Sequence, residues 1–428
     1  MNLCKKQVTK GRFCYDSRRH APVFYHARRV SPVTGSKTFS PHPPSRALHV
    51  PSLDRTENSL VMVITELDEG GAEKAFVRIA CGLQAKAWHV HAVSLRNAGP
   101  LAAQLETHNI PVTALNTATL SAPFAIPKLS RLLKTLRPDA VFSFLHQANL
   151  LSRIAASLAH IPCHISGIRV ADRRPFVVLP DRFTRKLTTH YVACSETVAR
   201  RHAALCRIPP SRISVIHNGV DIDQLLLAPS VPRSVLGLNE NDFVVLMAGR
   251  LTSQKAPQLL LHAFRILQQQ PSPRRPRLLL AGEGPDRPKL EQLASQLPDP
   301  SAVNFIGWRH DLPGIMKSAD LFVLPSAWEG LPNVLLEAQA IGLPVAATSV
   351  DGCIDALQSG AAGRLFPAND PNAIAQLIAE QIQNPRPAHE MATLAQHQLQ
   401  QTGHWEHCIN RCDLLLQRLV KNKTAELM

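Results

Sequence analysis

The chain has 428 residues, of which 45% are apolar, 18% charged and 5% aromatic. This length exceeds what one hydrophobic core requires and predicts two or three domains, while the composition excludes a chain that is disordered throughout. No apolar run approaches the roughly 18 residues of a membrane-spanning helix. Nine cysteines occur without a C-x-x-C pair, which indicates neither a disulfide framework nor a zinc site and fits a reducing cytoplasm.

Much of the net charge of +15 lies in the N-terminal segment. Residues 1–58 hold eleven basic and three acidic residues, a net +8, and they lack helix or strand periodicity, so we expect a disordered basic tail. A transit peptide or a translation start assigned too far upstream is an alternative to a functional tail. Basic domains often bind nucleic acid, but no known nucleic-acid-binding signature follows, and we expect no such partner.

From Ser59 onward, short β-branched runs alternate with amphipathic segments, the pattern of βαβ units around parallel sheets. The expected fold class is α/β, with an N-terminal Rossmann-like domain at 59–225, a linker at 226–241, a C-terminal domain at 242–404 and a closing helix at 405–428. The expected strands are Leu60–Thr65, His89–Leu95, Pro111–Leu115, Ala140–Leu145, His164–Ile168, Tyr191–Cys194, Ile213–His217, Phe243–Met247, Arg277–Ala281, Val303–Ile306, Leu321–Pro325 and Pro344–Thr348. Doubly wound domains bind ligands beyond the carboxyl ends of their strands, so functional residues are expected in the strand-to-helix loops.

The most informative stretch runs from Pro325 to Glu337. An apolar strand ends at Pro325, a loop carries Glu329, and Pro332 stands where the first turn of a helix tolerates proline. Glu337 then falls in the second helical turn, so both carboxylates can line one wall of a pocket.

The start of this helix is a candidate anion site. The backbone N–H groups of Asn333, Val334 and Leu335 are expected to point at a phosphate. A second candidate is the segment 247–255, where a strand delivers Arg250 to a sheet edge and Lys255 opens the next helix. Two cations at this spacing suit a diphosphate, whereas alone they would be interpreted as a solvated surface pair.

Two features of the first half face the same expected site. Gly70 and Gly71 follow the first strand and open a helix, where paired glycines let backbone approach a ligand, although ordinary tight turns also use them. His146 follows the strand Val-Phe-Ser-Phe-Leu. A histidine at a strand end is by itself more often structural.

Together these segments resemble the retaining glycosyltransferases of family four, which have the GT-B fold. The resemblance covers about residues 59–420, and its specific part is the Glu-x7-Glu stretch followed by Gly-Leu-Pro-Val. The other matching segments are 70–73 (Gly-Gly-Ala-Glu), 217–221 (His-Asn-Gly-Val-Asp), 249–251 (Gly-Arg-Leu) with Lys255, 281–284 (Ala-Gly-Glu-Gly), 305–307 (Phe-Ile-Gly) and 319–320 (Ala-Asp). The resemblance implies two domains facing a central cleft, with the last helix returning to the first domain.

The resemblance implies transfer of a sugar from a nucleotide sugar, usually a UDP-sugar, with retention at the anomeric carbon. By that similarity Glu329 and His146 would be the catalytic residues, near the anomeric centre and the donor sugar. The donor-binding residues would be Gly71, Arg250, Lys255, Gly307, Asn333, Val334, Leu335 and Glu337, with the two cations on the diphosphate and Glu337 on the ribose. Cations and a helix N-terminus stabilise the negative charge that a departing nucleoside diphosphate gains.

No metal and no other cofactor is expected, because the family that the chain resembles needs none. The string Asp221-Ile-Asp223 imitates a metal motif of the other glycosyltransferase fold, but its place at the linker makes it a chance string. Residues 282–285 lack the third glycine of a dinucleotide fingerprint, so NAD is not expected. Residues 351–355 depart from the Gly-Gly and Glu that the family often has there, which leaves the donor sugar open.

The segment Arg169–Lys186 carries six basic and two acidic residues around Pro-Phe-Val-Val-Leu-Pro. One interpretation is a solvated surface, and the other is a patch that attracts anionic lipid and suits a lipid-linked saccharide acceptor of surface-polysaccharide or lipopolysaccharide synthesis. The expected location is then the cytoplasm, at the inner face of the cytoplasmic membrane.

The alternatives to a transferase are a catalytically silent nucleotide-sugar-binding protein and a nucleotide-sugar epimerase of the same fold. The intact Glu-x7-Glu context argues against both.

Overall fold

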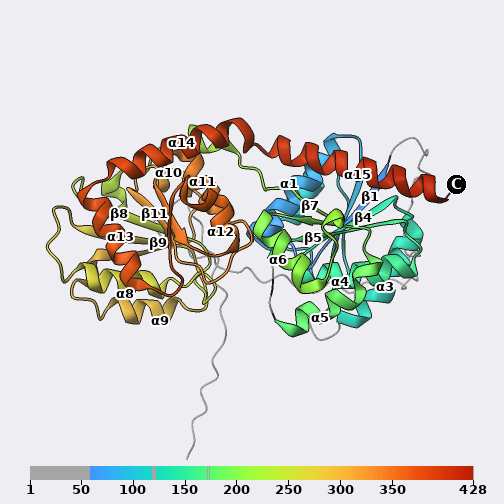
Figure 1. Ribbon diagram of the computed structural model, residues 1–428, viewed down its shortest axis with the longest axis horizontal. Helices are drawn as coiled ribbons and strands as arrows, with labels where there is room; N and C mark the ends of the chain where they lie inside the picture. Colours follow the sequence, from blue (N-terminus) through green and yellow to red (C-terminus); the bar gives the residue numbers. More distant parts are fainter. Residues whose placement is uncertain (1–57, 118–121, 171, 173, 428) are drawn as a thin grey trace, which may run out of the picture. The chain divides into compact units, whose positions relative to one another are not determined.

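The computed structural model describes residues 58–117, 122–170, 172 and 174–427. The tail expected at 1–58 therefore lies outside the described residues, apart from Asn58. The described chain forms two parallel sheets with helices on both faces (Figure 1). The expected α/β fold with two doubly wound units is confirmed.

The first sheet has the strand order β3-β2-β1-β4-β5-β6-β7. Its strands are β1 (Ser59–Ile64), β2 (His89–Ser94), β3 (Val112–Ala114), β4 (Ala140–Phe144), β5 (Cys163–Ile168), β6 (His190–Ala193) and β7 (Ile213–Val215). The helices of this half are α1 (Gly71–Ala85), α2 (Ala102–Thr107), α3 (Ala122–Leu136), α4 (His146–Leu158), α5 (Pro175–Thr184) and α6 (Glu196–Cys206), with 3-10 turns at Arg185–Leu187 and Pro210–Arg212. Every strand expected here is present within two residues.

The second sheet has the order β10-β9-β8-β11-β12-β13. Its strands are β8 (Phe243–Ala248), β9 (Pro276–Ala281), β10 (Val303–Gly307), β11 (Leu321–Leu324), β12 (Val345–Thr348) and β13 (Arg364–Phe366). Its helices are α7 (Ile222–Leu227), α8 (Gln258–Leu267), α9 (Arg287–Ala294), α10 (Leu312–Met316), α11 (Asn333–Ile341), α12 (Asp351–Ala356), α13 (Pro371–Gln383) and α14 (Arg386–Thr402), with 3-10 turns at Arg233–Leu236, Pro300–Ala302 and Gln358–Gly360. The sequence did not predict β13, whose residues Arg364, Leu365 and Phe366 contain no β-branched side chain.

The strands at the centre of each sheet are apolar on both faces, because helices cover both. In β1, Leu60, Met62 and Ile64 pack with α1, α2 and the final helix α15 (Trp405–Leu427), whereas Val61 and Val63 pack with α3 and α4. β8 alternates in the same way between α10 and α11 on one face and α8, α9 and α13 on the other. Figure 1 shows α1 and α15 above the first sheet with α3 and α4 below it, and α10 and α11 above the second sheet with α8 and α9 below it.

The strand order reverses direction between β1 and β4 in the first sheet and between β8 and β11 in the second. At such switch points the loops that leave neighbouring strands turn to opposite sides, which opens a crevice beyond the carboxyl ends of the strands. The loops after these four strands are therefore where a ligand would bind.

The segment expected as a linker, 226–241, holds the end of α7 and the turn Arg233–Leu236. Two of its side chains, Leu236 and Leu238, are buried in the core of the second sheet.

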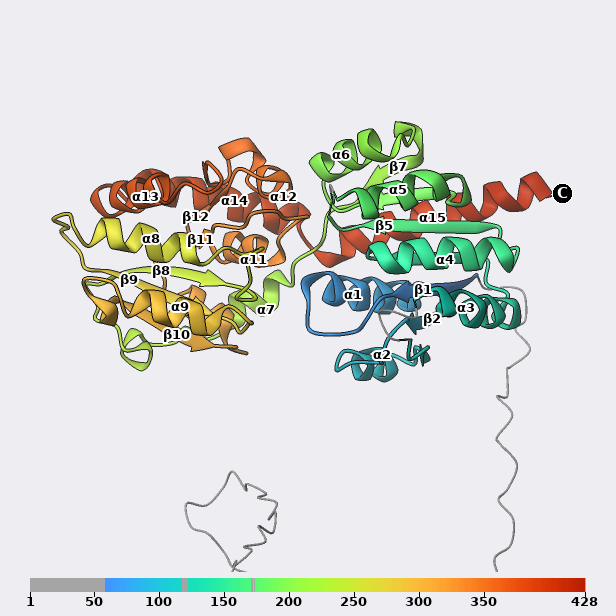
Figure 2. The same cartoon turned by 90° about the horizontal axis from the view of Figure 1, so that it is seen from below.

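The closing helix α15 packs on α1 and runs alongside β5 (Figure 2). Trp88 Nε1 donates to Asp413 Oδ1 of this helix at 2.8 Å. No helix in the described part of the chain is long and apolar enough to cross a membrane.

The start of α15 requires a glycine at position 219. A Cβ added to Gly219 would lie 2.3 Å from the Cα and 2.5 Å from the backbone nitrogen of Trp405, which is far inside contact distance. We predict that Gly219→Ala lowers the free energy of unfolding by about 1–3 kcal/mol, because backbone must shift to admit the methyl group. Denaturant titration measures this loss.

The matched control is Gly71→Ala, where an added Cβ meets nothing closer than 3.7 Å. Alanine at this first position of α1 is expected to leave stability unchanged or slightly raised. Equal losses in the two variants would contradict the steric explanation.

Candidate functional site

The loops after β8 and β11 bring together two of the predicted residues. Lys255 Nζ donates to Glu329 Oε1 at 2.6 Å, and Ser326 Oγ donates to the same oxygen at 2.6 Å. The side chains of Lys255 and Glu329 are 18% and 7% exposed, so this ion pair is largely shielded from water. The two loops thus place a cation and a carboxylate side by side at the carboxyl edge of the second sheet.

The structure corrects the expected position of Lys255. We expected Lys255 to open the next helix, but α8 begins at Gln258 and Lys255 lies in the preceding turn, where its N–H donates to the carbonyl of Thr252 at 3.0 Å. The turn directs the lysine back over the sheet edge toward Glu329, whereas a helical position would carry it away.

Close backbone packing fixes the loop that carries Glu329. A Cβ on the next residue, Gly330, would lie 1.6 Å from the carbonyl oxygen of Arg169, so only glycine fits. Arg169 itself is buried, donates to Asn218 and stacks 5.3 Å above the ring of Phe144. This corrects our assignment of Arg169 to an exposed basic patch, because its guanidinium is buried against Asn218 and the Phe144 ring.

Asn333, at the first position of α11, links the two halves. Asn218 Nδ2 donates to Asn333 Oδ1 at 2.6 Å, and Asn333 Nδ2 donates to the carbonyl of Gly71 at 3.2 Å. The predicted donor-binding residues Gly71 and Asn333 are thus in contact. Asn218 had no predicted role, although it lies inside the matched segment 217–221.

The N-terminus of α11 offers fewer free donors than expected. The N–H of Leu335 donates to the carbonyl of Pro332 at 3.0 Å. Within residues 58–117, 122–170, 172 and 174–427, no acceptor is found for the N–H groups of Asn333 and Val334. These two amides remain available to an anion, whereas Leu335 is already bonded.

Charged residues of α1 lie near the predicted donor-binding cations and carboxylates. Burial raises the pKa of the Glu73 carboxyl, and the charge of Arg250 opposes that shift. Burial also raises the pKa of Glu337, and the charge of Lys74 opposes it. No role was predicted for Glu73 and Lys74. The sequence of the first turn of α1 does not indicate which residues of other elements lie opposite it.

Two of the predicted site residues, Gly307 and His146, do not contact the Lys255–Glu329 pair. Gly307 ends β10, where its carbonyl accepts the N–H of Gly282 at 2.7 Å. His146 is the first residue of α4, and its Nδ1 lies 3.7 Å from Asp181 Oδ2. Neither has a direct contact with Lys255 or Glu329 among the described residues.

The segment 351–355, which departs from the family pattern, forms α12. Asp355 accepts hydrogen bonds from the backbone N–H and the hydroxyl of Thr197, both at 2.7 Å, and Asp351 pairs with Arg201. Both acids therefore hold α6 of the first half. Among the described residues one group of three metal-ligand side chains occurs, Asp181 with His202 and Cys206, and the string 221–223 is not part of it.

Comparison with known proteins identifies the class. Residues 69–224 match the model of Glycosyltransferase Family 4, and residues 232–398 match that of Glycosyl transferases group 1. The protein of Anabaena called HepE, solved in complex with UDP, superposes with a TM-score of 0.73 at 22% identity, covering 84% of this chain and 100% of that one. The fold is therefore GT-B, and the protein is a glycosyltransferase.

Two curated relatives agree with this class. The UDP-Gal:alpha-D-GlcNAc-diphosphoundecaprenol alpha-1,3-galactosyltransferase of Escherichia coli is 28% identical over 311 residues, 68% of this chain and 80% of that protein. The D-inositol 3-phosphate glycosyltransferase of Thermobispora bispora is 34% identical over 229 residues, 51% of this chain and 52% of that protein. The chain belongs to glycosyltransferase family four, with a Family 4 domain in its first half and a group 1 domain in its second.

The raised pKa of Glu337 predicts a pH-dependent effect of its removal. A carboxyl whose pKa rises on folding binds its proton more readily in the folded state, so its ionisation opposes folding above the ordinary pKa of 4.5. We predict that Glu337→Gln raises the Tm at pH 7 by on the order of 1–3 °C, and that the gain vanishes below about pH 4.5, where the wild-type carboxyl is protonated in both states.

Thermal unfolding between pH 4 and pH 8 measures this effect. Glu240→Gln, which changes an exposed loop carboxylate, is the matched control and should leave the Tm unchanged at every pH. A lower Tm for Glu337→Gln at pH 7 would show that the carboxylate stabilises the fold and would contradict the prediction.

Proposed function

We propose that the protein is a retaining glycosyltransferase that moves a sugar from a UDP-sugar to a lipid-linked saccharide acceptor without a divalent metal. The observation that carries the proposal is the shielded Lys255–Glu329 pair at the edge of the second sheet, beside the N-terminus of α11. A cation, a carboxylate and free helix amides at one switch point suit a sugar attached to a diphosphate.

Each group has a chemical task in this proposal. Arg250 and Lys255 neutralise the diphosphate, the amides of Asn333 and Val334 bind its oxygens, and Glu337 accepts hydrogen bonds from the ribose hydroxyls. Because these positive groups surround the leaving diphosphate, no metal ion is needed to balance its charge.

The reaction exchanges one bond for another at the anomeric carbon. The bond from C1 to the diphosphate oxygen breaks, and its electron pair stays on the diphosphate. The acceptor hydroxyl bonds to C1 on the same face, and its proton passes to the departing diphosphate oxygen. Glu329 lies near C1 in this proposal and stabilises the positive charge that develops on the sugar ring.

The name of the Escherichia coli relative supports the choice of donor and acceptor class. That protein is a UDP-Gal-dependent galactosyltransferase acting on a sugar carried by diphosphoundecaprenol. We propose the same class for this chain, a UDP-sugar donor and a saccharide on a lipid diphosphate, within surface-polysaccharide synthesis. Such an acceptor lies at a membrane, which requires the enzyme to work at the inner face of the cytoplasmic membrane.

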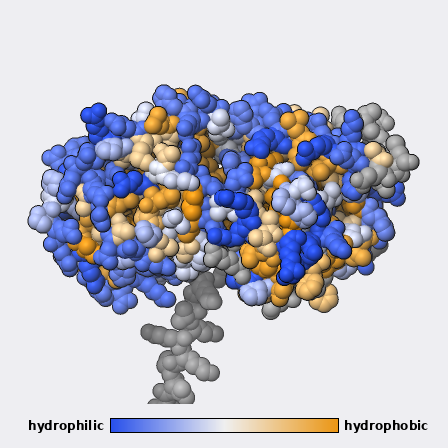
Figure 3. Space-filling view, viewed as in Figure 1, coloured by the Kyte–Doolittle hydropathy of each residue, from blue (hydrophilic) through white to orange (hydrophobic). Residues whose placement is uncertain are grey.

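The surface of α5 and the turn after it supports this location. Four apolar side chains are strongly exposed there: Phe176 at 67%, Leu179 at 47%, Phe183 at 80% and Leu187 at 41%. Exposed Arg174 and Lys186 lie in the same segment. Figure 3 shows orange surface with blue beside it where Figure 1 labels α5. Exposed aromatics with flanking cations are typical of surfaces that enter the headgroup region of anionic membranes.

Donor binding is tested by thermal shift in EDTA with UDP-galactose, UDP-glucose, UDP-N-acetylglucosamine and GDP-mannose. A ligand that binds only the folded protein raises its Tm, and we expect a shift of a few degrees with one UDP-sugar. Lys255→Met should abolish the shift, whereas Lys289→Met, an exposed lysine of α9, should preserve it. No shift with any of the four compounds would contradict the donor proposal.

Turnover separates a transferase from a silent binding protein. With the donor that shifts the Tm, release of UDP in the presence of a polyprenyl-diphosphate-linked sugar is expected from the wild type and should fall by about 100-fold or more in Glu329→Gln. Donor binding without release of UDP would favour the silent homologue instead.

Membrane binding is tested by flotation with phosphatidylglycerol vesicles. We expect the wild type to float with the vesicles and the double variant Phe176→Ser/Phe183→Ser to remain at the bottom, because two exposed aromatic anchors are lost. Phe124→Ser removes a similarly exposed phenylalanine, 70% exposed, outside this segment and should still float. Equal flotation of all three proteins would contradict the assignment of the surface.

A further inference from the structure

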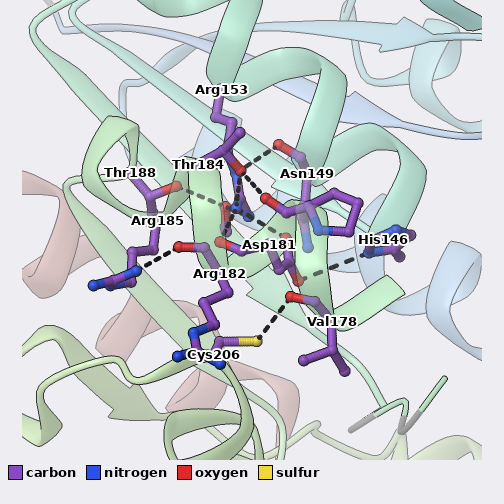
Figure 4. Close-up of polar contacts among 12 residues, drawn as sticks. His146, Asn149, Arg153, Val178, Asp181, Arg182, Thr184, Arg185, Thr188 and Cys206 are labelled. Carbon is purple, nitrogen blue, oxygen red and sulfur yellow. Dashed lines mark hydrogen bonds and ion pairs between the residues drawn. The ribbon is translucent and has the colours of Figure 1, made fainter. Parts of the chain in front are cut away.

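A buried ion pair lies directly behind His146. The Arg153 side chain of α4 is 0% exposed and the Asp181 side chain of α5 is 4% exposed, and Arg153 Nη1 lies 2.8 Å from Asp181 Oδ1 (Figure 4). Arg153 also donates to the hydroxyl of Thr184 at 3.0 Å and to that of Ser166 at 3.1 Å. These hydroxyl contacts hold the Arg153 guanidinium in place beside the Asp181 carboxylate.

Two imidazole rings share the other oxygen of this carboxylate. His146 Nδ1 lies 3.7 Å and His202 Nε2 lies 3.5 Å from Asp181 Oδ2. His146 Nδ1 is buried and has no hydrogen-bond partner among the described residues, although the side chain as a whole is 32% exposed. The ring thus turns its Nδ1 edge to the carboxylate and leaves its other edge accessible.

The backbone before His146 is strained. Leu145, between β4 and α4, has φ of 73° and ψ of 152°, a region that residues with a side chain rarely enter. Such strain persists only where the surroundings fix it, and it is common at functional sites. The turn therefore places His146 in a defined orientation at the switch point of the first sheet.

The titratable groups packed around His146 differ in whether they are charged at neutral pH. Burial raises the pKa of Asp181, but the adjacent His146 ring and the charges of Arg153 and His202 lower it below its usual value. Burial lowers the pKa of His202 to about 4 and raises that of Cys206 to about 12. On the exposed side, Asp172 pairs with Arg174. At neutral pH the anion facing Nδ1 is the Asp181 carboxylate.

Asp181, His202 and Cys206 have ligand atoms within 4.8 Å of one another, as a metal centre would require. However, the Arg153 guanidinium already neutralises Asp181, and the Cys206 thiol stays protonated. A metal cation at this point would meet a buried positive charge. The cluster is better explained as an ion pair that serves His146.

We propose that Asp181, fixed by Arg153, is a positioning residue that holds His146 with its Nδ1–H toward the carboxylate. In that tautomer Nε2 carries a lone pair on the accessible edge and accepts a hydrogen bond from a hydroxyl of the donor sugar. The role of the Nε2 edge rests on the proposed glycosyltransferase function, whereas the tautomer does not.

The tautomer is measured by NMR on the full chain labelled with ¹⁵N-histidine, with the His146 signals assigned by their loss in His146→Gln. We expect an Nδ1–H ring in the wild type and an Nε2–H ring in Asp181→Asn, because the amide of asparagine donates to Nδ1. His202→Asn removes the other ring beside Asp181 and should leave the His146 tautomer unchanged. The same tautomer in the wild type and in Asp181→Asn would overturn the inference.

Turnover with the UDP-sugar identified above gives an independent readout. Asp181→Asn should lower kcat about 100-fold with KM changed less than about 3-fold, His202→Asn should stay within about 3-fold of the wild type, and Asp181→Asn should add little to His146→Ala. If His146→Ala retains full turnover, the catalytic role of His146 fails. If His146→Ala is slow and Asp181→Asn is not, the positioning role of Asp181 is wrong.

Loss of the carboxylate leaves Arg153 buried without its partner, which can prevent folding. The double variant Arg153→Met/Asp181→Leu removes both charges and fills the space with apolar atoms. This protein should fold and show the same change of the His146 tautomer. An unchanged Nδ1–H ring in the folded double variant would also overturn the inference.

Discussion

Parallel strands all leave a sheet at one edge, and a sheet wound in two directions opens that edge at the strand pair where the order reverses. In this protein the pairs are β1 with β4 and β8 with β11. The loops after these strands carry Gly71, His146, Lys255 and Glu329. The rest of the structure, including helices packed on both faces of each sheet, serves to hold these four loops in position.

Two ion pairs in the described part of the chain differ in how far they are shielded from solvent. Arg153 and Asp181 form an ion pair inside the first half, where Arg153 also donates to two hydroxyl groups. Lys255 and Glu329 also pair, but their side chains keep some contact with solvent, and exposed Arg250 lies in the same loop as Lys255. The Arg153–Asp181 pair fixes geometry. Lys255 and Glu329 can instead exchange each other for a ligand, because the free energy cost of removing water is small where the side chains are already partly solvated.

Contacts between the two halves explain a departure from the family pattern. Asp351 and Asp355 stand where related enzymes often have glycines and a glutamate, and both bind α6 of the first half through Arg201 and Thr197. With the chain from Asn218 through Asn333 to Gly71, they form polar contacts between the halves. Polar contacts of this kind are typical of interfaces between domains of one chain.

From the sequence alone one could predict the α/β class, the positions of twelve strands, the loops that carry Arg250, Lys255 and Glu329, and the helix that carries Glu337. This was possible because strand alternation and loop chemistry are local properties of the chain. The sequence missed β13, which has no β-branched residue, and it placed Lys255 in a helix that begins three residues later.

Only the tertiary structure decided which charges are buried and what they face. Arg169 belongs to a basic stretch of sequence, yet its side chain is buried against Asn218 and Phe144. Asp181 belongs to the same stretch, yet it lies behind His146. Burial and pairing depend on residues far apart in the chain that the packing of sheets and helices brings together, and periodicity carries no information on such contacts.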